Sequence, residues 1–120
     1  MRQNLITALM LVVAFIHLLP IVGFFGAGRL STLYGIESDS PDLEILMRHR
    51  AVLFGILGTF FAYAAFNPPL QPIAFAGAAL SLAGFFYLAF SVGGYGAPIR
   101  KVVIADLIAA LCLAAAIALY

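Results

Sequence analysis

Long apolar stretches, separated by segments rich in polar residues, proline or glycine, divide the chain into four parts. The stretches cover residues 5–27, 43–66, 70–92 and 99–119. About 20 helical residues cross the hydrocarbon core of a bilayer, so each stretch is long enough for one transmembrane helix. The last two connections are short, so the helices that they join must run antiparallel. We therefore expect an all-α fold, with residues 1–120 forming one integral membrane up-down four-helix bundle.

Proline, serine and glycine mark the expected helix boundaries. The segment 40–44, Ser-Pro-Asp-Leu-Glu, predicts a helix that begins at about Pro41, with Ser40 as its cap and acids near its positive end. Residues 67–69, Asn-Pro-Pro, should end that helix, because two prolines cannot continue it. Residues 93–98, Gly-Gly-Tyr-Gly-Ala-Pro, predict a turn between the last two helices.

The composition excludes a water-soluble domain. The chain is 65% hydrophobic and 9% charged, with a mean hydropathy of +1.14. So few charges cannot cover a surface that faces water. The net charge of +1 gives no sign of nucleic-acid binding. Cys112 is the one cysteine, so no disulfide is expected, and its apolar surroundings predict a packing role.

Cationic side chains are unequally distributed between the two ends of the expected bundle. The end with the first and third connections carries five of them, whereas the other end carries only Arg2. The five are Arg29, Arg48, Arg50, Arg100 and Lys101. The positive-inside rule places the cation-rich end in the cytoplasm. It therefore predicts that both termini lie outside.

Two charges inside the apolar stretches form the centre of the expected site. Counted from the cation-rich end, Arg50 and Asp106 each lie roughly 10 Å along their helices. A lone charge near the bilayer centre costs roughly 2.5 to 3.5 kcal/mol on insertion scales, so Asp106 is expected to have a partner. Arg50 is the first candidate and Arg48 the second, because a guanidinium fits a carboxylate with two hydrogen bonds. The pair would either fix one helix against another or line a pocket for a polar head group or a proton.

The two histidines have different expected roles. His17 either bonds to a backbone carbonyl inside the bundle or serves as a proton relay or ligand contact, because histidine titrates near neutral pH. His49 shares a helical stripe with apolar and aromatic residues and is expected at the membrane interface. Their different depths argue against a haem held between them. No cluster of cysteines, histidines and acids has metal-ligand spacing, so we predict no metal site.

Two segments together carry a resemblance to a known family. Residues 33–36, Leu-Tyr-Gly-Ile, are followed by an acidic loop and by residues 48–55, Arg-His-Arg-Ala-Val-Leu-Phe-Gly. This order is similar to that of the small bacterial four-helix membrane proteins grouped as DoxX-like. Arg50 and Gly55 match the arginine and the glycine-rich second span of that group, and Asp106 matches the polar residue in its last span. The resemblance covers most of the chain and implies the bacterial inner membrane and a role facing lipid or quinone.

Three functions remain open from the sequence. The first is binding of an amphipathic quinone or lipid in a charge-lined pocket, with the protein as an accessory subunit. The second is a small transporter, although the first span lacks the acid that small multidrug exporters use. The third is a membrane enzyme, an isomerase or quinone-linked oxidoreductase, which would need a cofactor or partner because no nucleophile or redox centre is evident.

The candidate ligand-binding residues are the same for all three functions. They are His17, Arg48, His49, Arg50 and Asp106. In an enzyme, Asp106 and His17 would act as acid and base. The expected partners are membrane lipid together with either another membrane protein or a second copy of the chain. Nucleic acid is not an expected partner, and no residue is assigned a catalytic role from the resemblance.

Overall fold

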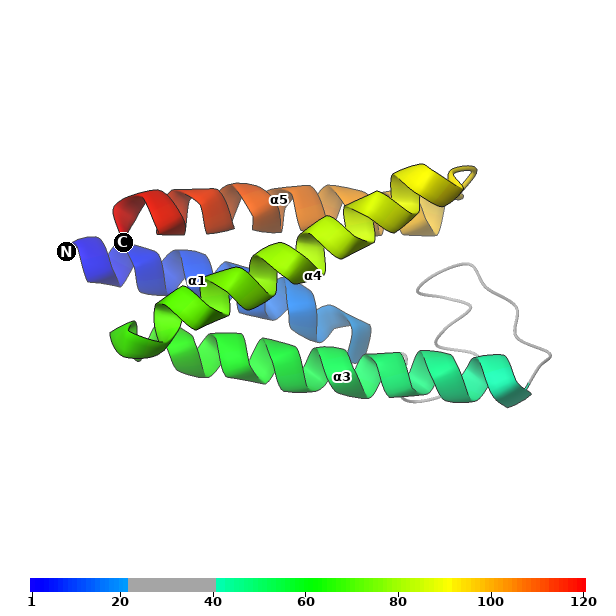
Figure 1. Ribbon diagram of the computed structural model, residues 1–120, viewed down its shortest axis with the longest axis horizontal. Coiled ribbons are helices and arrows are strands. Elements are labelled where there is room, and N and C mark those ends of the chain that lie inside the picture. The colour runs from blue at the N-terminus through cyan, green and yellow to red at the C-terminus, as the bar shows by residue number, and fades with distance from the viewer. Residues whose placement is uncertain (22–40) are drawn as a thin grey trace.

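The computed structural model describes residues 1–21 and 41–120. In these ranges the chain forms α1 (Arg2–Leu18), α3 (Pro41–Ala65), the short 3-10 helix η2 (Pro68–Leu70), α4 (Gln71–Val92) and α5 (Ala97–Leu119). The four α-helices alternate in direction, so that both termini and η2 lie at one end (Figure 1). We call this the terminal end, and the opposite end, with the turn between α4 and α5, the turn end. The predicted all-α, up-down four-helix bundle is confirmed.

Most helix boundaries follow the local signals in the sequence. α3 begins at Pro41, as predicted, with Asp42 and Glu44 in its first turn. It ends at Ala65, one residue before the predicted position and two residues before Asn67, which begins the Asn-Pro-Pro segment. In the turn between α4 and α5, Gly93 and Gly94 have φ angles of 67° and 69°, a backbone region that favours glycine.

The first helix begins earlier than predicted. α1 begins at Arg2, three residues before the expected position, and residues 19–21 continue it as a 3-10 turn that contains Pro20. The predicted end at residue 27 lies outside the described residues. So do the predicted cap Ser40, the cation Arg29 and the segment 33–36.

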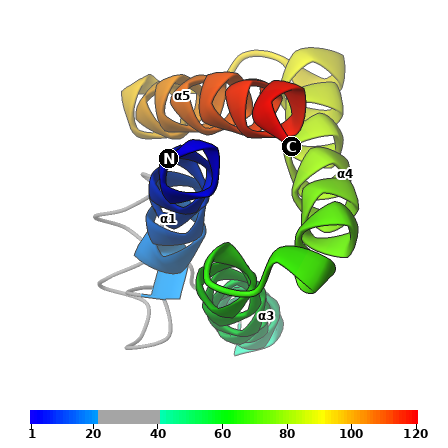
Figure 2. The same cartoon turned by 90° about the vertical axis from the view of Figure 1, so that its left-hand side faces the viewer.

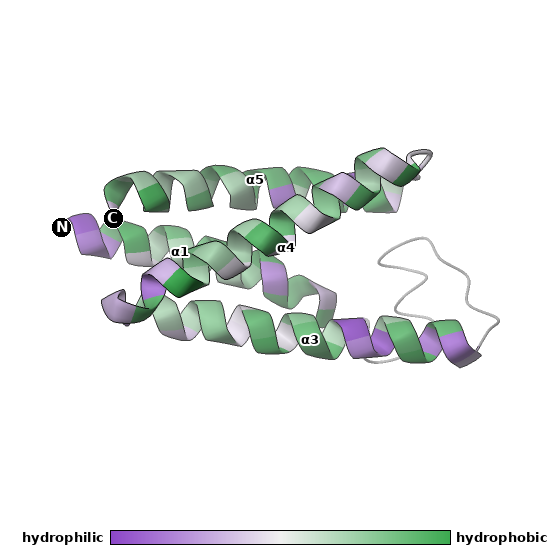
Figure 3. Cartoon of the chain, in the orientation of Figure 1, coloured by the Kyte–Doolittle hydropathy of each residue, from purple (hydrophilic) through white to green (hydrophobic). Residues whose placement is uncertain are grey.

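The exposed surface of the helices is apolar. All four helices are long and apolar enough to cross a membrane, yet at most 33% of the most apolar window in any of them is buried inside the protein. Large side chains such as Leu80, Phe90 and Leu111 are therefore exposed on the outside of the bundle. Figure 3 shows that hydrophilic positions gather mainly near helix ends, especially along the first half of α3. The chain is thus a multi-pass membrane protein, since lipid rather than water suits such a surface.

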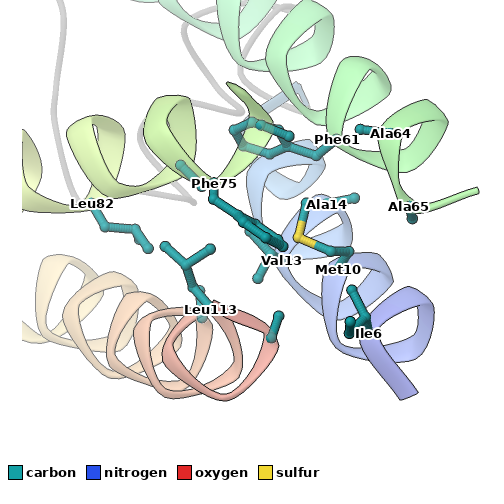
Figure 4. Packing of buried hydrophobic residues seen from close by; sticks show 14 residues of the cluster. Ile6, Met10, Val13, Ala14, Phe61, Ala64, Ala65, Phe75, Leu82 and Leu113 are labelled. Atoms are coloured by element: carbon teal, nitrogen blue, oxygen red, sulfur yellow. The ribbon is translucent and has the colours of Figure 1, made fainter. Parts of the chain in front are cut away.

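α1 is the central packing element of the bundle. Seen from the terminal end, the helices follow one another around a ring in chain order, and α1 packs mainly against α3 and α5 (Figure 2). Small residues allow this closeness: a Cβ added at Gly58 of α3 would lie 2.7 Å from Cγ of Leu18. From the other side, Phe75 of α4 reaches across to Met10 and Val13 of α1 (Figure 4).

A polar cluster holds the terminal end together. Gln71 has no exposed surface, and its amide exchanges hydrogen bonds of 3.0 and 3.1 Å with the amide of Gln3 on α1. Its Nε2 also donates to the carbonyls of Ala64 and Ala65, at 3.3 and 3.2 Å, and Thr7 donates to the Ala65 carbonyl at 2.7 Å. These carbonyls belong to the last turn of α3, where a helix leaves its acceptors without intrahelical partners. The cluster thus ties α1, α3 and α4 to one another.

Candidate functional site

α3 and α4 diverge toward the turn end (Figure 1). A cavity of about 280 Å³ lies at this end. Its walls come from α3, α4, α5 and the turn that joins the last two. The lining residues are Met47, Arg50, Phe85, Leu88, Ala89, Val92, Gly93, Tyr95 and Ile99. Arg50 is the one charged side chain among the described residues that line the cavity. The site therefore has one arginine in a largely apolar wall.

Arg50 is held in place by an aromatic ring on its own helix. Its Cζ atom lies over the ring of Phe54, 4.4 Å from the ring centroid. The two residues are four positions apart, so they are neighbours on one face of α3. A cation over an aromatic face is stabilised by the quadrupole of the ring without losing its charge. Arg50 is half-buried, so its side chain is partly shielded from its surroundings.

Asp106 lies on α5 and is also half-buried. The positive charge of Arg50 acts electrostatically on its carboxyl group, so the structure brings together the two charges that the sequence placed at similar depth. The sequence had led us to expect a buried Asp106, but the side chain keeps partial exposure. Asp106 does not line the cavity, and its direct or water-mediated contact with Arg50 stays a prediction.

His17 is a buried residue at the centre of the bundle. Its Nδ1 lies 2.9 Å from the carbonyl oxygen of Val13, and its Nε2 lies 2.9 Å from Oγ of Ser81 on α4. A carbonyl can only accept, so Nδ1 carries the hydrogen, and in the neutral ring Nε2 accepts from the serine hydroxyl. This matches the expected alternative of a histidine bonded to a backbone carbonyl, with Ser81 as an additional partner.

Aromatic contacts connect this histidine to the cavity. The ring of His17 stacks on Phe54, with centroids 5.8 Å apart and planes inclined by 19°, and meets the edge of Phe61 at 4.9 Å. Phe54 therefore has Arg50 and His17 as neighbours. Our sequence analysis did not single out this residue, although its spacing of four from Arg50 was a usable signal.

The other two candidate residues do not line the cavity. Arg48 is half-buried on α3, and His49 is exposed, while its place at the membrane interface stays a prediction. Of the five candidates, the structure thus brings Arg50, Asp106 and His17 into one region, and only Arg50 lines the cavity. The apolar lining from α4 was not predicted, because leucine, phenylalanine and valine are common in every span. Tyr95 carried a weak signal as a polar aromatic residue within a glycine-rich turn.

The part of the chain that the structure describes contains no group of three or more histidines, cysteines or acids that could hold a metal ion. Cys112 is half-buried against the core, as its predicted packing role requires. Among the described residues, Arg50, Asp106 and His17 are titratable groups of this region, and their surroundings are largely apolar. No family model matches the chain, and no curated protein or solved structure shows significant similarity to it.

Proposed function

We propose that the protein binds an amphipathic molecule, a membrane lipid or a quinone, in the cavity between α3, α4 and α5. The observation that carries this proposal is the position of Arg50 in a wall that is otherwise largely apolar. Binding sites for small molecules typically combine apolar walls with a few polar groups that orient the ligand. A volume of about 280 Å³ suits a head group with the first part of its chain rather than a whole lipid.

The composition of the wall favours a ligand with one polar end. A fully polar solute would lose its hydration against Phe85, Leu88 and Val92 without gaining hydrogen bonds. A fully apolar molecule would displace solvent from the guanidinium of Arg50 and give no acceptor in return. An amphipathic molecule satisfies both parts of the wall.

The arrangement of the helices supports entry of the ligand from the bilayer. α3 and α4 diverge toward the turn end, and two lining residues of α4, Leu88 and Val92, are 59% and 81% exposed. These side chains therefore contact the lipid phase as well as the cavity. A molecule dissolved in the membrane can reach Arg50 sideways without crossing an aqueous phase.

The surroundings of His17 favour binding over catalysis. In the enzyme alternative this residue would be a base, yet both of its ring nitrogens are already engaged by Val13 and Ser81. His17 does not line the cavity either. Proton exchange with a bound molecule would require these hydrogen bonds to break, whereas binding alone requires no change.

The location is part of the proposal. We place the protein in the bacterial inner membrane, in line with its resemblance to DoxX-like proteins. The cavity lies at the end that carries Arg48, Arg100 and Lys101, so the positive-inside rule places it on the cytoplasmic side.

Filling the cavity tests the proposal. Ala89 lines the cavity, so Ala89→Phe should occupy the space that a ligand needs. Ala83→Phe is the matched control, because Ala83 is exposed on the same helix and is not part of the lining. Native mass spectrometry from a neutral detergent would measure adducts with phospholipids, fatty acids and a short-chain ubiquinone. We expect Ala89→Phe to reduce adducts at least about tenfold and Ala83→Phe to leave them unchanged. Equal binding by both variants would contradict the proposed site.

A further inference from the structure

We infer that the cavity selects amphiphiles whose head group is negatively charged, a carboxylate or a phosphate, over neutral amphiphiles such as quinones and alcohols. This inference rests on the binding function proposed above and specifies the class of ligand. Three observations carry it: the charge in the lining, the ring that supports that charge, and a second charge placed outside the lining.

The first observation is the environment of the charge. Arg50 lines the cavity together with apolar residues such as Phe85, Ala89 and Ile99. Low-dielectric surroundings strengthen the attraction between opposite charges compared with water. A guanidinium also binds a carboxylate or phosphate through two parallel hydrogen bonds, and bonds to an ionised acceptor are roughly twice as strong as neutral ones. A quinone carbonyl offers a neutral acceptor only.

The second observation is the support of the guanidinium. Phe54 holds Arg50 by a cation–π contact, which orients the cation but does not neutralise it. Arginine has five N–H donors, so it can receive a head group alongside its other contacts. The site thus has a positioned positive charge before a ligand arrives, which reduces the ordering cost of binding.

The third observation is the place of Asp106. Arg50 on α3 and Asp106 on α5 are near enough for their charges to influence each other, but only Arg50 lines the cavity. The carboxyl group on α5 therefore competes with an anionic head group for the same cation. It should weaken the binding of anions and leave the binding of neutral molecules nearly unchanged. A site adapted to a neutral quinone would show no such dependence on Asp106.

The selectivity is measured with four probes that share a similar chain. Dodecyl phosphate and dodecanoate are anionic, whereas dodecanol and decyl-ubiquinone are neutral. Native mass spectrometry of the full chain gives a dissociation constant for each. We expect the anionic probes to bind at least about tenfold more tightly, which corresponds to one strong charge-assisted hydrogen bond. Neutral probes that bind as tightly as the anionic ones would overturn the inference.

Three variants assign the selectivity to the two charges. Arg50→Met should abolish the preference for anions. Asp106→Asn should raise the affinity for both anionic probes about threefold or more, and leave that for dodecanol unchanged. Misfolding cannot produce a higher affinity for anionic probes. The Asp106→Asn variant therefore tests the inference even if Arg50→Met folds poorly. Lys101→Met is the matched control, because Lys101 is an exposed cation at the turn end outside the lining. An unchanged or weaker affinity of Asp106→Asn for anions would contradict the inference.

Further measurements distinguish a phospholipid from a fatty acid as the source of the anion. They also distinguish failure of the proposed binding from failure of the charge selection. Tighter binding of dodecyl phosphate than of dodecanoate would indicate a phospholipid-type head, and the reverse order a fatty acid. Displacement of either probe by inorganic phosphate alone would show that no chain is needed and would overturn the amphiphile assignment. If Ala89→Phe weakens all four probes equally and no preference for anions exists, binding stands and charge selection fails. If Ala89→Phe weakens none of them, both proposals fail.

Discussion

At the terminal end of the bundle, the side chain of Gln71 is completely buried, and its amide has partners on α1 and at the end of α3. At the turn end, Arg50 lines a cavity of about 280 Å³ between helices that diverge. Both residues carry strongly polar groups into a membrane protein. At the first end the polar group is enclosed by the protein, and at the second we propose that a ligand joins the protein contacts of Arg50.

This difference separates stability from binding along the length of the bundle. A polar group whose partners are all within the protein is costly to replace, because its partners lose their hydrogen bonds as well. Arg50 is only half-buried, and a partly exposed side chain can be replaced at lower cost to folding than a fully buried one. We therefore expect substitutions at the terminal end to affect unfolding and substitutions at the turn end to affect binding.

The largest expected effect is at the terminal end. Gln71→Leu would remove the partner of the Gln3 amide and one of the donors to each of the carbonyls of Ala64 and Ala65. We expect a loss of roughly 2 to 4 kcal/mol in the free energy of unfolding. Denaturation of the purified protein in detergent would measure it. Arg50→Met provides the contrast, and a greater loss of stability in Arg50→Met than in Gln71→Leu would reverse the comparison.

A second test compares two glycines that differ in their surroundings. In Gly58→Ala, the added Cβ would lie 2.7 Å from Cγ and 2.8 Å from Cδ2 of Leu18, and 3.1 Å from the carbonyl oxygen of Ala14. We expect a loss of roughly 1 to 3 kcal/mol because α1 and α3 must move apart. At Gly84 no heavy atom lies within 4 Å of an added Cβ, so Gly84→Ala should gain roughly 0.5 to 1 kcal/mol from helix propensity. Thermal melts would measure both variants. A shift of both melting temperatures in the same direction would contradict the close packing of α1 against α3 at Gly58.

A third test asks whether the backbone conformation of the turn between α4 and α5 contributes to the free energy of unfolding. Gly94 has a φ angle of 69° and nothing within 4 Å of an added Cβ, so Gly94→Ala isolates the backbone cost. We expect a loss of roughly 1 kcal/mol in unfolding free energy. The control is Gly96→Ala, since Gly96 has a φ angle of −86° and an added Cβ would meet only Pro98 Cδ, at 3.8 Å. Equal melting temperatures for the two variants would show that this turn tolerates a side chain at Gly94.

The smallest expected effect lies between the two ends. Ser81→Ala removes the hydrogen bond between α4 and His17. Hydrogen bonds between membrane helices contribute about 0.6 kcal/mol on average, so we expect a loss of that size. Ser91→Ala, on the exposed side of the same helix, should have no effect on the denaturation curve. A loss of several kcal/mol for Ser81→Ala would instead make His17 a main support of the fold.

The fold could be predicted from local signals, but the faces of the helices could not. Proline at position 41, the Asn-Pro-Pro segment and the glycines at 93 and 94 act on the backbone wherever they occur, so they located the ends of α3 and the turn before α5. The rotation of each helix has no such signal. In a soluble protein the apolar face identifies the core, but here the exposed faces are apolar too.

The sequence predicted only part of the candidate site, because it identifies residues that are rare in a span but not the face on which a common residue lies. Charges are rare in the spans, so Arg50 and Asp106 stood out, and their similar depth followed from counting residues. The residues that complete the site, such as Phe54 and Leu88, are ordinary in composition and are identified only by the contacts they make. Gln71 was missed although an uncharged amide next to an apolar helix was a usable signal of a buried hydrogen bond.

The hydrogen bonds of α1 also constrain the order in which the protein can be assembled. Gln3 and His17 belong to α1, which is synthesised before α4, but their side-chain partners, Gln71 and Ser81, belong to α4. Thr7 likewise depends on the last turn of α3. α1 must therefore remain in the bilayer without these hydrogen bonds until α4 has been inserted. Completion of the bundle is consequently a late event that depends on α4 rather than a stepwise addition of finished helices.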